Sequence, residues 1–297
     1  MLLTLLTIPL YVAATGRYGY RMIIALAVSV LVGYLAETLG ARIRGKKAAC
    51  LGYTAWVLFP LVLPPAFPLW MLMTTVFFGT VAGVVFFGGH GRQLAAPVAL
   101  GWTFASLSYP AAFGFGWTFP FTDPAAGFTR YVAAVPSIDH PIAYLLDRVD
   151  VTAVEILLGN FPQTPGNAVP LLLILCGLVL WLLRAVDFGG SIVFLGTVTI
   201  LSAVFHLAMP GIFPSPRSLL VGNLLIAAFF IYPDTRISPR TWKGRWVTGI
   251  LAGITAFIIR SFSDFSCGVF YAVLFGNVFS PILDEWMLNA KYGRKKA

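Results

Sequence analysis

The sequence predicts an all-α integral membrane protein with about ten transmembrane helices, arranged as two inverted five-helix repeats in which some helices are broken. The first observation is composition: 59% of the 297 residues are hydrophobic and 10% are charged, whereas a soluble domain carries about 25% charged residues. The second is that apolar runs of span length recur along the chain, separated by short polar loops. Too few polar side chains are present to cover a water-facing surface, so the expected solvent is a lipid bilayer.

A helix that crosses the hydrocarbon needs roughly 20 apolar residues, and some shortening is tolerated. The first run has no basic segment ahead of it and leads directly into a second one, which favours a transmembrane helix over a cleaved signal peptide. In the third run, Pro60, Pro64 and Pro65 each remove a backbone donor, so a kinked or half-crossing helix is expected. The ten candidate spans are 1–15, 19–40, 50–66, 68–88, 94–114, 168–184, 188–208, 217–232, 245–263 and 267–286.

The charges predict the orientation of these spans. If the N-terminus is cytoplasmic, that side receives most of the basic residues, in Arg184 and the segments 42–47, 90–92, 233–245 and 291–297. The bias follows the positive-inside rule and predicts cytoplasmic N- and C-termini with an extracytoplasmic loop, 116–167. It also accounts for the net charge of +9 without a nucleic-acid partner, which would need a folded polar domain. The loop carries the acidic residues Asp123, Asp139, Asp147, Asp150 and Glu155.

The long loop divides the chain into a first five-helix half (1–115), the extracytoplasmic segment (116–167) and a second five-helix half with a basic cytoplasmic tail (168–297). Five spans precede the loop and five follow it, so the two halves enter the membrane with opposite orientations, as in inverted repeats. The fourth and ninth spans each carry a G-x-x-x-G motif, in GTVAG (79–83) and GILAG (249–253), a spacing that allows close helix packing.

Cysteine and histidine usage argues against metal chemistry in this chain. The three cysteines are far apart and form no C-x-x-C pair, so neither an iron–sulfur cluster nor a zinc site is expected. A b-type haem needs two histidines at one depth, and the predicted spans place His90 at the cytoplasmic edge and His140 and His206 towards the outside. No residue of the chain is predicted to be catalytic.

Three blocks of the sequence carry distinctive motifs. The first block combines LPPAFPLW (63–70) with FFGGHGRQLAAP (86–97), and the second is EILLGNFPQTPGNAVPLLLILCGLVLW (155–181). The third, the most specific, runs from NLLIAAFFIYPDTRISPRTWKGR (223–245) to GVFYAVLFGNVFSPILD (268–284). These blocks resemble the RnfD/NqrB family of membrane proteins, which belong to the Rnf electron-transport complex and to the sodium-pumping NADH:quinone oxidoreductase. The resemblance covers nearly the whole chain.

This resemblance implies an electron-transfer subunit in the cytoplasmic (inner) membrane of a prokaryote, working with other membrane and redox subunits of a complex. In the family, FMN is esterified to a threonine in D-x-x-[ST]-G-A-T outside the membrane, and a second flavin and a quinone are associated with this type of protein. In DPAAGFT, the residues Asp123, Gly127 and Thr129 match that spacing, so Thr129 is the candidate for covalent FMN. Ala126 and Phe128 depart from the motif.

Four further residues are predicted to contact a cofactor. His90 lies in a glycine-rich loop whose backbone can approach a ligand or a partner protein. Gly166 and Asn167 lie in the loop that resembles the flavin-proximal loop of the family, where Asn167 replaces a glutamate. Asp234 is either a helix cap or a polar contact at the end of a broken helix. Trp56 stands where the family has a smaller residue and is expected to fill space that a second flavin would need.

Two other functions remain open. A solute channel or transporter could use the same inverted-repeat scaffold without redox work, and a structural membrane anchor could have lost its cofactor sites. Several positions that carry polar residues in the family do not carry them here, which favours these two functions. The family pattern along the chain favours electron transfer.

Overall fold

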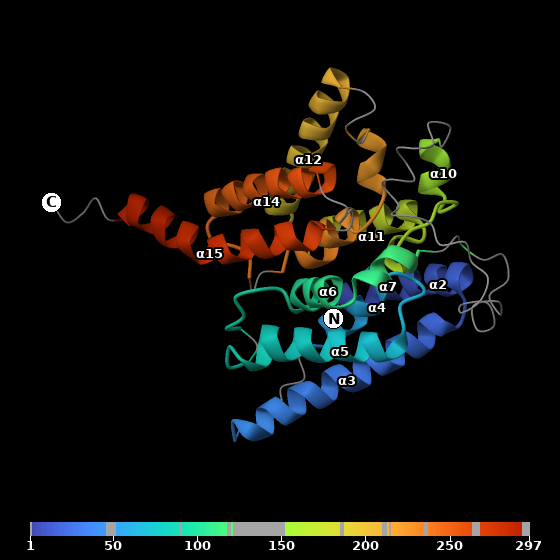
Figure 1. Ribbon diagram of the computed structural model, residues 1–297. Coiled ribbons are helices and arrows are strands. Elements are labelled where there is room, and N and C mark those ends of the chain that lie inside the picture. The colour runs from blue at the N-terminus through green and yellow to red at the C-terminus, as the bar shows by residue number, and fades with distance from the viewer. Residues whose placement is uncertain are drawn as a thin grey trace.

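The computed structural model (Figure 1) is helical throughout the parts of the chain that it describes, with loops and turns between the helices. These parts are residues 2–45, 52–89, 91–117, 120, 152–184, 187–209, 213, 215–234, 237–262 and 268–292. They include helix in each of the ten predicted spans.

The N-terminal part begins with a short α1 and a longer α2, which turns at Gly19 into α3. A proline-rich loop separates α4 from α5, and α5 continues as the π-helix η1. The bounds are α1 (Leu2–Leu5), α2 (Thr7–Tyr18), α3 (Arg21–Ile43), α4 (Tyr53–Val62), α5 (Leu69–Thr80), η1 (Val81–Val85), α6 (Pro97–Ser108) and α7 (Pro110–Phe115).

The C-terminal part contains three long helices, α12, α14 and α15, and a broken segment in which the short α13 continues as a second π-helix, η4. Its bounds are α10 (Ala153–Leu157), the 3₁₀ turn η2 (Pro165–Asn167), α11 (Pro170–Leu182), α12 (Gly189–Ala208), the 3₁₀ turn η3 (Pro216–Leu220), α13 (Leu224–Ile226), η4 (Ala227–Ile231), α14 (Trp242–Phe262) and α15 (Val269–Tyr292).

Three of these helices are long and apolar enough to cross a membrane: α3, α12 and α14. Shorter apolar helices cover 53–62, 69–85 and 170–182. Many large apolar side chains of these helices are exposed, as expected for surfaces that face lipid rather than water. The all-helical class is therefore confirmed for the described residues, and the apolar helices are consistent with a membrane protein, while ten crossings and inverted repeats stay predictions.

The expected break in the third span is present. Helix α4 ends at Val62, and Leu63 adopts an extended conformation, with φ −88° and ψ 158°. A residue that precedes proline is pushed out of the helical region by the proline ring, so Pro64 accounts for this end. The helix is 10 residues long, about half of what a full crossing requires.

Helices from each part of the chain pack mainly among themselves (Figure 1). Helices α3, α5 and α6 form one group, with α5 between the other two, and α12, α14 and α15 form a second group around α14. Helices α6 and α15 join the groups, where the ring centroids of Trp102 and Phe270 lie 5.1 Å apart.

The two G-x-x-x-G motifs bring helices into close contact, as predicted. A Cβ on Gly79 would lie 2.6 Å from the carbonyl oxygen of Pro97 at the start of α6. A Cβ on Gly249 would lie 2.8 Å from the carbonyl oxygen of Gly190 in α12. The first motif therefore packs on the following helix, whereas the second packs on the preceding long helix.

Candidate functional site

Two broken helices meet inside the protein, and polar groups gather at their junction. The last carbonyl of α4, on Val62, accepts a hydrogen bond of 2.8 Å from the Nδ2 of Asn223, which precedes α13. Asn223 is fully buried. The amide therefore satisfies one of the carbonyls that a helix end leaves without an intrahelical partner, and it joins segments 161 positions apart in the sequence.

The predicted flavin-proximal loop is part of the same junction. The Nδ2 of Asn167 donates to the carbonyl oxygens of Leu220, at 2.7 Å, and Gly222, at 3.1 Å. It also contacts the side chain of Gln163. Gly166 packs so closely on α4 that a Cβ would lie 2.9 Å from the carbonyl oxygen of Leu61. The structure thus brings Gly166 and Asn167 together in a packed part of the interior.

Three buried oxygen atoms in this region accept no hydrogen bond from the described residues. They are Oγ1 of Thr164, Oδ1 of Asn167 and Oδ1 of Asn223, and all three side chains have zero exposure. A buried acceptor without a donor costs about 1–3 kcal/mol. Such oxygens at the junction of broken helices are suited to a hydrogen-bond donor or to a cation.

Asp234 lies at the end of the other broken segment. Its backbone N–H donates to the carbonyl of Ile231, the last residue of η4, at 3.3 Å, and its own carbonyl accepts from the N–H groups of Ile237 and Ser238. The residue therefore organises the turn that follows a π-helix. Single-turn π-helices are often found at functional sites, and the cofactor contact predicted for Asp234 stays a prediction.

The other predicted contacts with FMN cannot be placed. Asp123, Gly127, Thr129 and His90 lie outside the described residues. Gly89 and Gly91, on either side of His90, have positive φ values of 112° and 90°, a conformation that glycine adopts readily because it has no Cβ.

Trp56 of α4 is packed against α3, and its filling of the space of a second flavin stays a prediction. Its side chain is 3% exposed, and a Cβ on Gly33 of α3 would collide with the indole ring. The indole therefore fills the space between α3 and α4, and only a glycine at position 33 allows this packing. No aromatic ring of a ligand could share that space without moving Trp56.

A buried carboxylate in α3 was missed in the sequence. Glu37 is 2% exposed within a helix whose apolar window has a mean hydropathy of 2.1. A Cβ on Gly52 would lie 2.9 Å from its Oε2 and 3.0 Å from the Nε1 of Trp56, so the carboxylate and the indole lie side by side. Ionisable groups inside membrane spans are costly and usually serve ions or protons. The sequence could have revealed Glu37 as the single acidic residue in the apolar run GYLAETLG (33–40).

Two charged residues near span ends join distant segments. Arg260 is 5% exposed and donates to the carbonyls of Ser218 and Val221. Asp284 accepts a 2.7 Å bond from the Oγ1 of Thr241 at the start of α14. The sequence alone could not reveal these bonds, because each joins residues at least 39 positions apart.

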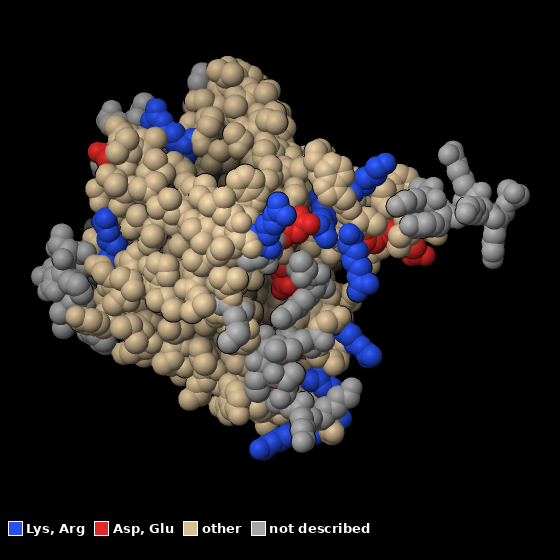
Figure 2. Space-filling view, turned by 180° about the vertical axis from the view of Figure 1, so that it is seen from behind, with Lys and Arg blue, Asp and Glu red and all other residues tan. Residues whose placement is uncertain are grey.

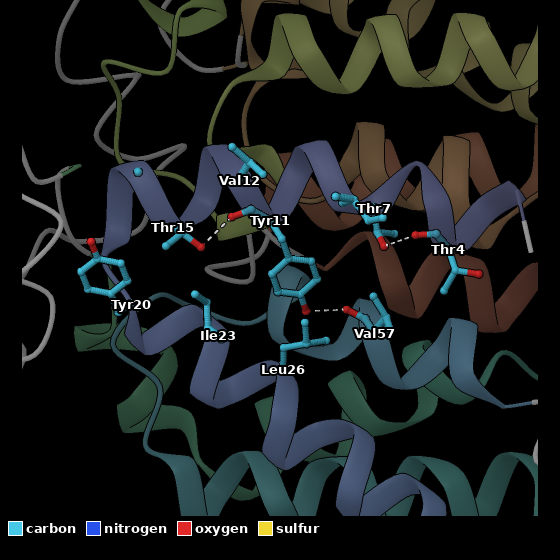
Figure 3. A pocket seen from close by; sticks show the side chains of 11 residues that line it. Thr4, Thr7, Tyr11, Val12, Thr15, Tyr20, Ile23, Leu26 and Val57 are labelled. Carbon is cyan, nitrogen blue, oxygen red and sulfur yellow. Dashed lines mark hydrogen bonds between the residues drawn. The ribbon is translucent and has the colours of Figure 1, made fainter.

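A cavity of about 570 Å³ lies along the N-terminal helices, outside the junction (Figure 3). Three of its hydroxyl groups already donate to backbone carbonyls: Thr7 to Thr4, Thr15 to Tyr11, and Tyr11 to Val57, each at 2.7 Å. The wall therefore presents mainly hydrocarbon. The lining residues are Thr4, Thr7, Ile8, Tyr11, Val12, Thr15, Gly16, Tyr20, Ile23, Leu26 and Val57.

Comparison with known proteins identifies the family. The chain matches the NQR2, RnfD, RnfE family over residues 1–293. It is 29% identical over 279 residues to the B component of the Na(+)-translocating NADH-quinone reductase of Ectopseudomonas mendocina (strain ymp), covering 91% of this chain and 68% of that protein. It is 27% identical over 330 residues to the D component of the ion-translocating oxidoreductase complex of Tolumonas auensis, covering 99% and 94%. The sequence resemblance is confirmed, and the chain belongs to the NQR2, RnfD, RnfE family.

Proposed function

We propose that this chain is an integral membrane electron-transfer subunit of a flavin-dependent, ion-translocating oxidoreductase complex in the cytoplasmic membrane of a prokaryote. Relatives that are named as parts of such complexes support the proposal. The partners are then the other membrane and redox subunits, with a quinone as a further partner, because the chain has neither a nicotinamide-binding motif nor iron–sulfur ligands in its sequence.

The proposed ion translocation rests on the burial of Glu37. Glu37 is 2% exposed in an apolar helix, and ionisable side chains inside membrane spans are rare and commonly mark the path of an ion or a proton. The buried oxygens at the junction of α4 and α13 offer further neutral ligands deeper in the protein. Glu37 is therefore assigned to receive the transported cation.

The helix neighbours support an inverted repeat. In the first half α5 packs between α3 and α6, and in the second half α14 packs between α12 and α15. The pairs α3 and α12, α5 and α14, and α6 and α15 are the second, fourth and fifth spans of each half. The third span of one half and the corresponding eighth span of the other are both short and broken, as α4 and α13–η4, which is typical of transporter folds with a site near the midplane.

The charge distribution supports cytoplasmic termini. Figure 2 shows most of the visible Lys and Arg side chains along one edge of the molecule, on the right in that view, next to a broad uncharged surface. Arg44, which follows α3, donates to the carbonyl of Val85 at the end of η1, and Arg245 pairs with Asp187 just before α12. A one-sided excess of basic residues is what the positive-inside rule expects of a cytoplasmic face.

For FMN, the proposal rests on Thr129. When bound, the flavin would supply one-electron and two-electron transfer. The residues assigned to hold it are Thr129, as the ester acceptor, with Asp123 and Gly127 of the same motif in the loop 116–167. No second flavin is assigned, because Trp56 and the packed loop at Gly166 occupy the expected places with protein atoms.

The test is ion uptake by the whole complex in proteoliposomes, with NADH as the donor because sodium-translocating relatives carry that name. We expect Glu37→Gln to reduce uptake of the coupling ion to the level of passive leak, because the neutral amide cannot attract a cation. Glu285→Gln is the matched control, since Glu285 is exposed and should leave uptake unchanged. Unchanged uptake in Glu37→Gln would overturn the role of Glu37.

A second candidate is a membrane anchor without cofactors. The packing of Trp56 against Gly33, and of Gly166 against Leu61, favours it because space for a cofactor ring is filled. An anchor predicts copurification with partner subunits and an absorption spectrum without flavin bands. A solute channel on the same scaffold predicts solute flux without redox activity.

A further inference from the structure

The ends of α3 and η1 form an edge where arginines and exposed apolar side chains lie together. Gly40 of α3 packs directly on Val85 of η1, and Arg44 Nη1 donates to the carbonyl of Val85 at 2.7 Å. The next residues are unusually exposed for apolar side chains: Ile43 is 86% exposed and Phe86 is 76% exposed. A surface of this kind is typical of the boundary between lipid chains and headgroups.

Two guanidinium groups lie over one glycine turn at this edge. A Cβ on Gly89 would lie 3.9 Å from Nη2 of Arg44, and a Cβ on Gly88 would lie 3.9 Å from Nη1 of Arg92. Both glycines have positive φ values, 112° and 90°, so the turn needs residues without a Cβ. The backbone therefore leaves room for the two arginines to lie next to each other.

Neither arginine is neutralised within the described part of the chain. The side chain of Arg44 donates to a carbonyl, and its buried Nε has no partner there. Arg92 is exposed, and its backbone N–H, rather than its side chain, donates to Gly89. By contrast, Arg245 at the other basic helix end pairs with Asp187. The charge at the α3–η1 edge therefore suits an external anion.

We propose that the α3–η1 edge binds one anionic phospholipid. Its phosphate lies between Arg44 and Arg92, because a guanidinium group donates two parallel hydrogen bonds to phosphate oxygens. Its acyl chains lie along Ile43 and Phe86. Basic residues at the ends of membrane helices attract acidic headgroups, and the flanking apolar side chains favour a lipid over a soluble acidic protein.

The test is native mass spectrometry of the full chain after detergent delipidation. The probes are phosphatidylglycerol and the zwitterionic phosphatidylcholine at equal concentration. We expect one phosphatidylglycerol to be retained in preference to phosphatidylcholine, and each arginine to contribute about fivefold to that retention. Arg92→Gln should therefore weaken retention about fivefold, and because the Arg92 side chain is exposed, this variant should fold like the parent. Arg44→Gln combined with Arg92→Gln should abolish the preference.

The matched control removes the same charge elsewhere. Arg240→Gln combined with Lys243→Gln replaces two exposed cations near the start of α14 and should leave retention unchanged. An equal loss in this control, or equal retention of both lipids, would overturn the site in favour of a diffuse positive surface. Displacement of the lipid by millimolar inorganic phosphate would overturn the lipid assignment, because binding would then need only a phosphate group and no acyl chains.

Discussion

Single polar side chains decide how this apolar chain ends its helices inside the membrane. The amides of Asn167 and Asn223 donate to three backbone carbonyls, those of Leu220, Gly222 and Val62, at or next to helix ends. In hydrocarbon an unpaired carbonyl is costly, so broken helices need such partners. The sequence predicted a cofactor contact for Asn167. It could not reveal the backbone carbonyls that Asn167 and Asn223 bond, because these lie 53 to 161 positions away.

Asn223→Leu tests this role. The leucine has a similar volume but leaves the Val62 carbonyl without its donor, so we expect a loss of about 1 kcal/mol of stability. The readout is the Tm of the purified chain in detergent. Thr199→Val is the control, because Thr199 bonds only within its own helix, to Leu195, and should leave the Tm nearly unchanged. A Tm for Asn223→Leu equal to that of the control would contradict the role of Asn223.

At the level of elements, the apolar runs predicted the helices and the prolines predicted the break after α4. The π-helices η1 and η4 could not be predicted, because an extra residue in a turn depends on packing against neighbours rather than on periodicity. The burial of Glu37 was also hidden, since it depends on Trp56 and Gly52 of another segment. Local pattern thus gives the existence of elements, and tertiary contact decides their ends.

The contact between α3 and α4 gives a prediction for glycine. Gly33→Ala should destabilise the protein by about 1–3 kcal/mol, because the added methyl group collides with the indole of Trp56. Gly196→Ala in α12 is the control: no atom lies within 4 Å of its Cβ position, so the change should be neutral or slightly stabilising. Chemical denaturation of both variants in detergent measures the difference. Equal stability of the two would contradict the packing of α4 on α3.

For the whole molecule, orientation follows from the balance of charge along the chain. The predicted cytoplasmic segments and the predicted extracytoplasmic loop 116–167 were assigned from charge alone, and Figure 2 shows more of the visible Lys and Arg side chains along one edge than on the opposite side. Family membership covers residues 1–293, so the same account applies to both halves. Composition does not indicate a cofactor. The FMN proposal depends instead on the short motif that contains Thr129.

The topology can be measured with a membrane-impermeant thiol reagent. In a background without the three native cysteines, Ser137→Cys should react in intact cells, because the loop 116–167 is predicted to be extracytoplasmic. A cysteine at Ala297 should react only after the cells are opened. The reverse pattern would contradict the orientation.

The central claim, an electron-transfer subunit with covalent FMN, is tested most directly by flavin fluorescence of the denatured chain in a gel after co-expression with a flavin transferase. The account predicts a fluorescent band for the parent chain and for the control Thr122→Ala in the same loop, and no fluorescence for Thr129→Ala. A dark parent band, or a fluorescent band that persists in Thr129→Ala, would contradict it.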